Sequence, residues 1–147
     1  MTLPAQKILI IGGGFTGMSA AILLKQLGAD VELVEIDPNW RTDGAGITVS
    51  GPSLRAIEAI GVLPQFKAQG AITEGVKIFN AEGMQIKEIQ TPAVPNSSIV
   101  GGGGIMRPVL ARILGEATKA KGVDVHLGVT FSRIEEIGDQ VHVTFSD

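Results

Sequence analysis

The sequence predicts an α/β fold in which a Rossmann-like βαβ parallel sheet carries inserted antiparallel hairpins. Three observations predict this architecture. A buried strand, a glycine-rich turn, a helix and a second strand follow one another within residues 7–35. Alternating segments around short turns predict hairpins at residues 76–89 and 130–145. A helical pattern over residues 109–121 leads into a further apolar strand at residues 123–127, as in a crossover connection.

The size and composition fit one globular domain that covers residues 1–147. A net charge of −3 gives no reason to expect nucleic acid or an anionic membrane as a partner. The chain has no cysteine, which excludes disulfides and thiolate metal sites and is compatible with a cytoplasmic location. We expect no metal site, because His126 and His142 have no third ligand near them. No stretch has the roughly 20 apolar residues of a membrane span, and no secretory signal is evident.

The first strand is expected at Lys7–Ile11, where the residues are mostly aliphatic, as in a strand that is buried on both faces. Gly12, Gly14 and Gly17 follow it with the spacing G-x-G-x-x-G. In a dinucleotide-binding loop the first glycine permits the tight turn and the second lets the backbone approach a pyrophosphate. The third lets the helix pack closely on the strand.

The helix after these glycines begins around Phe15 and Thr16 and closes at Gly28. Its N-terminal N–H groups favour an anion, so both opening residues are predicted to contact a cofactor. A second strand, Val31–Val34, then leads to Glu35, a carboxylate placed to accept hydrogen bonds from ribose hydroxyls. The glycine spacing alone is weak, but this whole context predicts a dinucleotide site. The alternative is a βαβ unit whose glycines serve packing only.

The middle of the chain alternates short elements. Glycines at both ends of residues 44–46 predict an extended segment that passes close to a bulky group. Ser53 is the expected N-cap of a helix that ends at Gly61, and a shorter helix is expected at residues 63–69. Residues 91–104, with two prolines and four consecutive glycines, predict a long mobile loop. Pro108 suits the first turn of the next helix.

These motifs resemble the N-terminal part of the FAD-dependent aromatic-hydroxylase family, the single-component flavoprotein monooxygenases that include p-hydroxybenzoate and salicylate hydroxylases. The resemblance runs along essentially the whole chain. The family's opening fingerprint continues as G-x-G-x-x-G-x3-A-x6-G, and Ala21 and Gly28 match its last two positions. In the family this motif holds the ADP part of FAD. The resemblance therefore implies FAD as the cofactor.

Further positions match one by one. The acid that ends the second strand matches Glu35, although Ile36 follows it where the family often has a basic residue. The arginine just before a Gly-x-Gly-Ile segment matches Arg41, with Gly46 in that segment. The arginine that begins the crossover helix matches Arg107. The resemblance places both arginines beside the cofactor; the alternative is that each is a solvated surface residue.

Two aromatic residues are also singled out. Phe131 falls near the position where the family lays a side chain against the adenine, and the alternative is a core residue of an alternating strand. Trp40 is an unusual aromatic next to the arginine of the second motif, where it could shield the adenosine. No catalytic side chain is predicted, because chemistry in this family belongs to the flavin.

The resemblance implies an enzyme that hydroxylates an aromatic or similar small molecule with NAD(P)H as co-substrate. Residues 72–104 would begin a substrate-domain insertion. Family members are much longer, so we expect the 147-residue chain to be inactive alone and to need a complementing C-terminal chain or self-association. Two alternatives stay open: another FAD-dependent oxidoreductase, such as an amine oxidase or a flavin dehydrogenase, or a non-catalytic nucleotide-binding module. An NAD-specific domain fits least well, because of the inserted hairpins.

Overall fold

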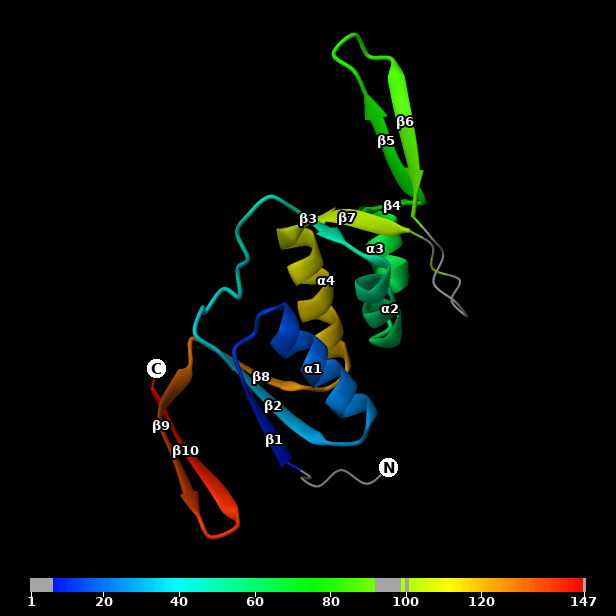
Figure 1. The fold of residues 1–147 in the computed structure, drawn as a ribbon. Coiled ribbons are helices and arrows are strands. Elements are labelled where there is room, and N and C mark those ends of the chain that lie inside the picture. Colours follow the sequence, from blue (N-terminus) through cyan, green and yellow to red (C-terminus); the bar gives the residue numbers. More distant parts are fainter. Residues whose placement is uncertain (1–6, 92–98, 100, 147) are drawn as a thin grey trace. The chain divides into compact units, whose positions relative to one another are not determined.

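The structure is a computed structural model, and it confirms the predicted α/β class with a parallel sheet and antiparallel hairpins (Figure 1). It divides into two compact units. The first contains Met1–Thr42 and Leu114–Asp147, and the second contains Asp43–Ile113. The residues that the structure describes are 7–91, 99 and 101–146.

A three-stranded parallel sheet forms the centre of the first unit. Its strands are β1 (Lys7–Ile11), β2 (Asp30–Glu35) and β8 (Asp124–Leu127), in the order β1-β2-β8. Helix α1 (Phe15–Gln26) connects the first two strands and packs against them. The predicted βαβ unit is therefore confirmed, and β1 lies at one edge of the described sheet.

The core of this unit lies between α1 and the sheet. Small and branched side chains fill it, because α1 has to lie close to the strands. The buried cluster consists of Ala21, Ala29, Val31, Leu33 and Val123. Gly28 ends the helix with a φ of 88°, a left-handed conformation that suits glycine at this position.

The predicted C-terminal hairpin is also present in the first unit. Strands β9 (Thr130–Ile137) and β10 (Gln140–Ser146) pair antiparallel, with a register shift before Phe145. The Val129 N–H donates to the carbonyl oxygen of Glu35 at 3.0 Å. This bond ties the start of the hairpin to the end of β2.

An antiparallel sheet and two helices build most of the second unit. The sheet has the order β3-β7-β4, with β3 at Gly46–Val49, β7 at Gly102–Met106 and β4 at Ala71–Thr73. Helices α2 (Gly51–Ala59) and α3 (Leu63–Gln69) contact each other, and their buried residues include Leu54, Ile57 and Phe66.

A second hairpin and a fourth helix complete the described elements. The predicted middle hairpin forms from β5 (Gly75–Phe79) and β6 (Gln85–Gln90). Helix α4 (Arg107–Ala120) begins in the second unit and continues into the first. None of the helices in the described ranges is long and apolar enough to cross a membrane.

Two sequence predictions are wrong in detail. The N-cap of α2 is Ser50, with φ −85° and ψ 170°, and not Ser53. Pro52 explains the shift, because proline fits the first turn of a helix, where its missing N–H costs nothing. Ser53 therefore already lies inside the helix.

The glycine run of residues 101–104 is the second correction. Residues 102–104 belong to strand β7 rather than to a loop. A Cβ on Gly103 would lie 2.6 Å from the carbonyl oxygen of Ala71 and 3.1 Å from the Phe66 ring. Glycine is needed in β7 because α3 and β4 approach its backbone closely. Within the remainder of the predicted loop, residues 92–98 and 100 lie outside the described residues.

Candidate dinucleotide-binding site

The loop between β1 and α1 is shaped by glycines that have different physical roles. Gly12 has a φ of 104°, which favours glycine, and its N–H donates to the Val34 carbonyl at 2.8 Å. A Cβ on Gly17 would clash with the carbonyl oxygen of Gly12. These two glycines are therefore explained by the turn and by the close packing of helix on strand.

Gly14 is different, because nothing in the fold requires a glycine there. It is the N-cap of α1, with φ −70° and ψ 178°, a conformation that any residue adopts. A Cβ at this position would meet no other atom within 4 Å. The missing side chain therefore leaves open space in front of the helix, which is what the approach of a pyrophosphate requires.

The electrostatics at the start of α1 also favour a bound anion. Phe15 is half-buried, Thr16 is exposed, and the first turn contains no acidic residue. The N–H groups of a first helical turn have no partners within the helix and carry a partial positive charge. The predicted residues of this loop thus lie together around one helix terminus.

Glu35 joins this loop to the end of β2. Its Oε2 accepts a hydrogen bond from the Gly13 N–H at 2.6 Å, and its Oε1 accepts one from the Asp37 N–H at 2.8 Å. An ionised carboxylate has about four lone-pair sites, so two of them remain for a ligand. Glu35 can therefore hold the loop between β1 and α1 and also accept hydrogen bonds from ribose hydroxyl groups.

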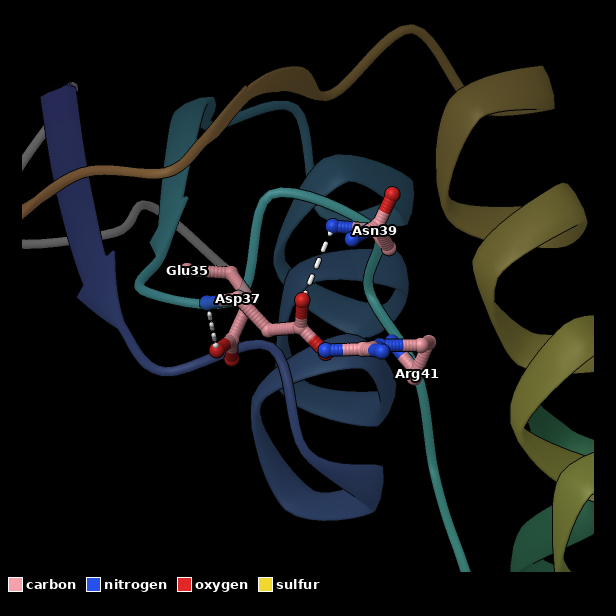
Figure 2. Close-up of polar contacts among 4 residues, drawn as sticks. All are labelled: Glu35, Asp37, Asn39 and Arg41. Carbon is pink, nitrogen blue, oxygen red and sulfur yellow. Dashed lines mark hydrogen bonds and ion pairs between the residues drawn. The ribbon is translucent and has the colours of Figure 1, made fainter.

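Asp37 organises the chain beyond β2, as Figure 2 shows. Its carboxylate accepts hydrogen bonds from the Asn39 N–H at 2.9 Å and from the Arg41 N–H at 3.0 Å. Arg41 adds its Nε at 3.2 Å, with an exposed side chain. The backbone N–H of Asn39, followed by that of Arg41, lowers the pKa of Asp37. Ile36 beside them is 67% exposed.

Trp40 makes a contact that the sequence did not predict. Its indole Nε1 donates to the Gly13 carbonyl at 2.7 Å. Its φ of 49° is left-handed, which is unusual for a bulky residue and costs roughly 1–2 kcal/mol. Such a conformation persists only where the surroundings hold it. Gly13, the middle glycine of the Gly12–Gly14 run, was the available signal, because a Cβ at this position would clash with the indole nitrogen.

Arg107 and Gly46 come together in the second unit. Gly46 pairs with Met106, and the Arg107 N–H donates to the Ala45 carbonyl at 3.0 Å. A Cβ on Gly44 would lie 3.0 Å from the Arg107 Cδ, so this glycine makes room for the arginine side chain. The structure thus explains Gly44 by its fit to the first residue of α4, whereas a Cβ on Gly46 would make only an ordinary contact, 3.8 Å from the carbonyl oxygen of Ile105.

Phe131 lies on β9, opposite Phe145 at the register shift. It is 44% exposed, so the alternative of a buried core residue is wrong. Its strand starts next to Val129, which is bonded to Glu35 as described above. Within the described part of the chain, no group of three or more acidic, histidine or cysteine side chains could hold a metal ion.

The chain belongs to the FAD binding domain family, whose model matches residues 5–147. A Bacillus subtilis (strain 168) protein, provisionally named FAD-dependent monooxygenase YetM, is 32% identical over 97% of this chain and 38% of its own length. The 3-amino-4-hydroxybenzoate 2-monooxygenase of Streptomyces cremeus is 29% identical over 96% of this chain and 36% of its own length. The resemblance to FAD-dependent monooxygenases is therefore confirmed.

A solved structure supports the same family. A variant of 2-methyl-3-hydroxypyridine-5-carboxylic acid oxygenase is 25% identical and has a TM-score of 0.74, over 95% of this chain and 35% of that chain. This chain spans 38% and 34% of the first two curated relatives, so about a third of their length. The open space at Gly14 and the carboxylate of Glu35 fit the ADP part of FAD.

Proposed function

We propose that this chain forms the ADP-holding part of a flavin monooxygenase that uses NAD(P)H and O2 to hydroxylate an aromatic or similar small molecule. The observation that carries the proposal is the unobstructed N-terminus of α1 at Gly14, next to the carboxylate of Glu35. FAD supplies the redox chemistry when it is bound. The residues of this chain bind and orient the cofactor.

In this proposal the loop holds the pyrophosphate and Glu35 holds the ribose, with Ile36 beside it. Their roles follow from the hydrogen bonds and open space described above. Arg41 and Arg107 are cations that suit phosphate oxygens or the ribityl chain. Phe131 offers an exposed aromatic face to the adenine. Gly46 pairs with Met106, the residue before Arg107, and would lie beside the cofactor with it.

The substrate class is proposed from the relatives. The names of two of them, given above, describe oxygenation of a hydroxylated aromatic ring that also carries a carboxylate. We place the start of a substrate-domain insertion at residues 72–104. The β5–β6 hairpin supports this proposal because it exposes large apolar side chains, namely Val76, Phe79, Met84, Ile86 and Ile89.

We also propose that a complementing segment covers the free edge of β1. Strand β1 pairs only with β2 among the described strands, and an open cleft of about 820 Å³ lies between it and the β9–β10 hairpin. Its apolar lining includes Ile11, Ile134 and Phe145. An added strand would pair with β1 and bury these side chains. The coverage of about a third of the relatives leaves ample chain for such a segment. The cysteine-free composition is compatible with a reducing cytoplasm, where we place the protein.

The test is a pair of variants at Gly14. Asp and Asn are both good N-cap residues, so Gly14→Asp and Gly14→Asn should fold as well as the wild type. Both should weaken FAD binding, measured by calorimetry, because a side chain fills the space for the pyrophosphate. The Asp variant should bind at least about tenfold more weakly than the Asn variant, because it adds charge repulsion to the anion. Unchanged affinity in both variants would place the ligand elsewhere.

The catalytic part of the proposal has its own measurement. NADH or NADPH oxidation by the 147-residue chain with FAD should stay near background and rise only when the complementing segment is supplied. Fast, substrate-stimulated oxidation by this chain alone would contradict the need for that segment. FAD binding without any activity in a complemented protein would support a non-catalytic module instead.

A further inference from the structure

We propose that Trp40 is the positioning residue of the phosphate-binding loop, acting through Gly13. This inference deepens the proposed function and rests on it for the identity of the ligand. Gly13 lies between the turn glycine, Gly12, and the N-cap glycine, Gly14. Its position therefore fixes the direction in which the start of α1 points.

Both polar groups of Gly13 are held by side chains from beyond β2. Its N–H donates to Glu35 at 2.6 Å, and its carbonyl accepts from the Trp40 indole at 2.7 Å. Gly13 itself is buried. A buried carbonyl that loses its donor pays the full cost of desolvation, so the indole bond matters more than an exposed one would.

Trp40 is itself held from several sides, so it can act as a support. Its backbone N–H donates to the Asp37 carbonyl at 3.1 Å. Its ring packs beside Gly115, where a Cβ would lie 3.7 Å from the ring and 3.9 Å from the sulfur of Met18. The Lys119 ammonium lies 5.5 Å from the ring centroid. These contacts connect the loop to α4.

The consequence is a preorganised loop. A loop that is already in its binding conformation loses less entropy when the ligand arrives. Removing the indole donor should therefore weaken FAD binding even where the ring and the fold remain. Because the chain has 1 tryptophan and no tyrosine, its intrinsic fluorescence also reports on Trp40 and on a flavin nucleotide bound next to it.

The first measurement needs no variant and no ligand. In the wild-type chain, the single indole N–H should exchange with solvent far more slowly than in a free peptide, because it is bonded to Gly13. The amide of Gly13 should be protected as well. Indole exchange at the rate of an unfolded peptide would overturn the proposal.

The second measurement compares two variants. Trp40→Phe keeps an aromatic ring and removes the donor, whereas Lys119→Met removes the cation over the ring and keeps the donor. We expect Trp40→Phe to speed exchange of the Gly13 amide and to raise the Kd for FAD by about three- to tenfold, the value of one hydrogen bond. Lys119→Met should change the Kd by less than about twofold, because an exposed cation–π contact is weak.

The outcomes separate the two proposals. Equal losses in both variants, or no change in Trp40→Phe, would overturn the positioning role. If the wild-type chain binds no FAD, the proposed function fails, and the exchange rates still decide the role of Trp40. Saturable quenching of the wild-type tryptophan fluorescence by FAD, with the Kd that calorimetry gives, would support both.

Discussion

At the scale of single residues, Gly17 is fixed by packing alone. Since its Cβ would clash with the Gly12 carbonyl, Gly17→Ala should lower the free energy of unfolding by about 3 kcal/mol through overpacking. Urea unfolding with an unchanged m-value measures this loss. Gly14→Asn is the matched control, and it should retain the wild-type midpoint. An equally stable Gly17→Ala would contradict the close approach of Gly17 to the Gly12 carbonyl oxygen.

Asp37 makes the stability of the folded chain depend on pH. Because hydrogen bonds from Asn39 and Arg41 lower its pKa, the ionised form is favoured in the folded state. Its contribution to stability is therefore fully present above the ordinary pKa of about 3.9 and is lost as the pH falls through the lower, folded value.

We expect a carbon-13 NMR titration of the Asp37 carboxyl group to show a midpoint below the ordinary value. Asp37→Asn should remove this part of the acid sensitivity of the loop, and it should shift the amide signal of Asn39 or Arg41 at neutral pH, because an amide keeps only one of the two acceptor oxygens. A midpoint at or above the ordinary value would contradict the hydrogen bonds drawn in Figure 2.

At the scale of elements, strand β7 contains a glycine because neighbouring elements leave no room for a side chain at one of its positions. A Cβ on Gly103 would meet Ala71 and Phe66, whereas one on Gly104 would lie 3.8 Å from the Ile47 carbonyl oxygen, an ordinary contact. Gly103→Ala should therefore destabilise the chain by roughly 1–3 kcal/mol. Gly104→Ala should be neutral or stabilising by up to about 1 kcal/mol, because alanine loses less backbone entropy.

Thermal unfolding of the two alanine variants checks this difference. Similar unfolding midpoints for the two variants would show that α3 does not pack closely against β7. The comparison is sharp because the two positions are neighbours in one strand and receive the same substitution.

The elements that the sequence predicted are those with a strong local signal. The strand, glycine turn and helix of residues 7–28 carry a continuous apolar run, a glycine spacing and helix end signals, and the fold retains these elements. The glycine run in β7 predicts a loop and not a strand. Only the close approach of α3 and β4 explains why a glycine occurs in this strand. The bond from Trp40 to Gly13 spans 27 residues, so the glycine at position 13 signals a close approach but does not identify Trp40 as the partner.

At the scale of the whole molecule, the site residues belong to two units. The glycine loop, Glu35, Arg41 and Phe131 lie in the first, and Gly46 and Arg107 lie in the second. The sequence assigned both groups to one cofactor through the family resemblance. Their shared role in one cofactor site is part of the proposed function.

The most direct test of the central claim is calorimetric titration of the 147-residue chain with FAD and, separately, with NAD. We predict saturable FAD binding that Gly14→Asp weakens by at least about tenfold relative to Gly14→Asn, with much weaker binding of NAD. Tight binding of NAD with none of FAD, or FAD binding that is unchanged in Gly14→Asp, would contradict the assignment of the glycine loop to the ADP part of FAD.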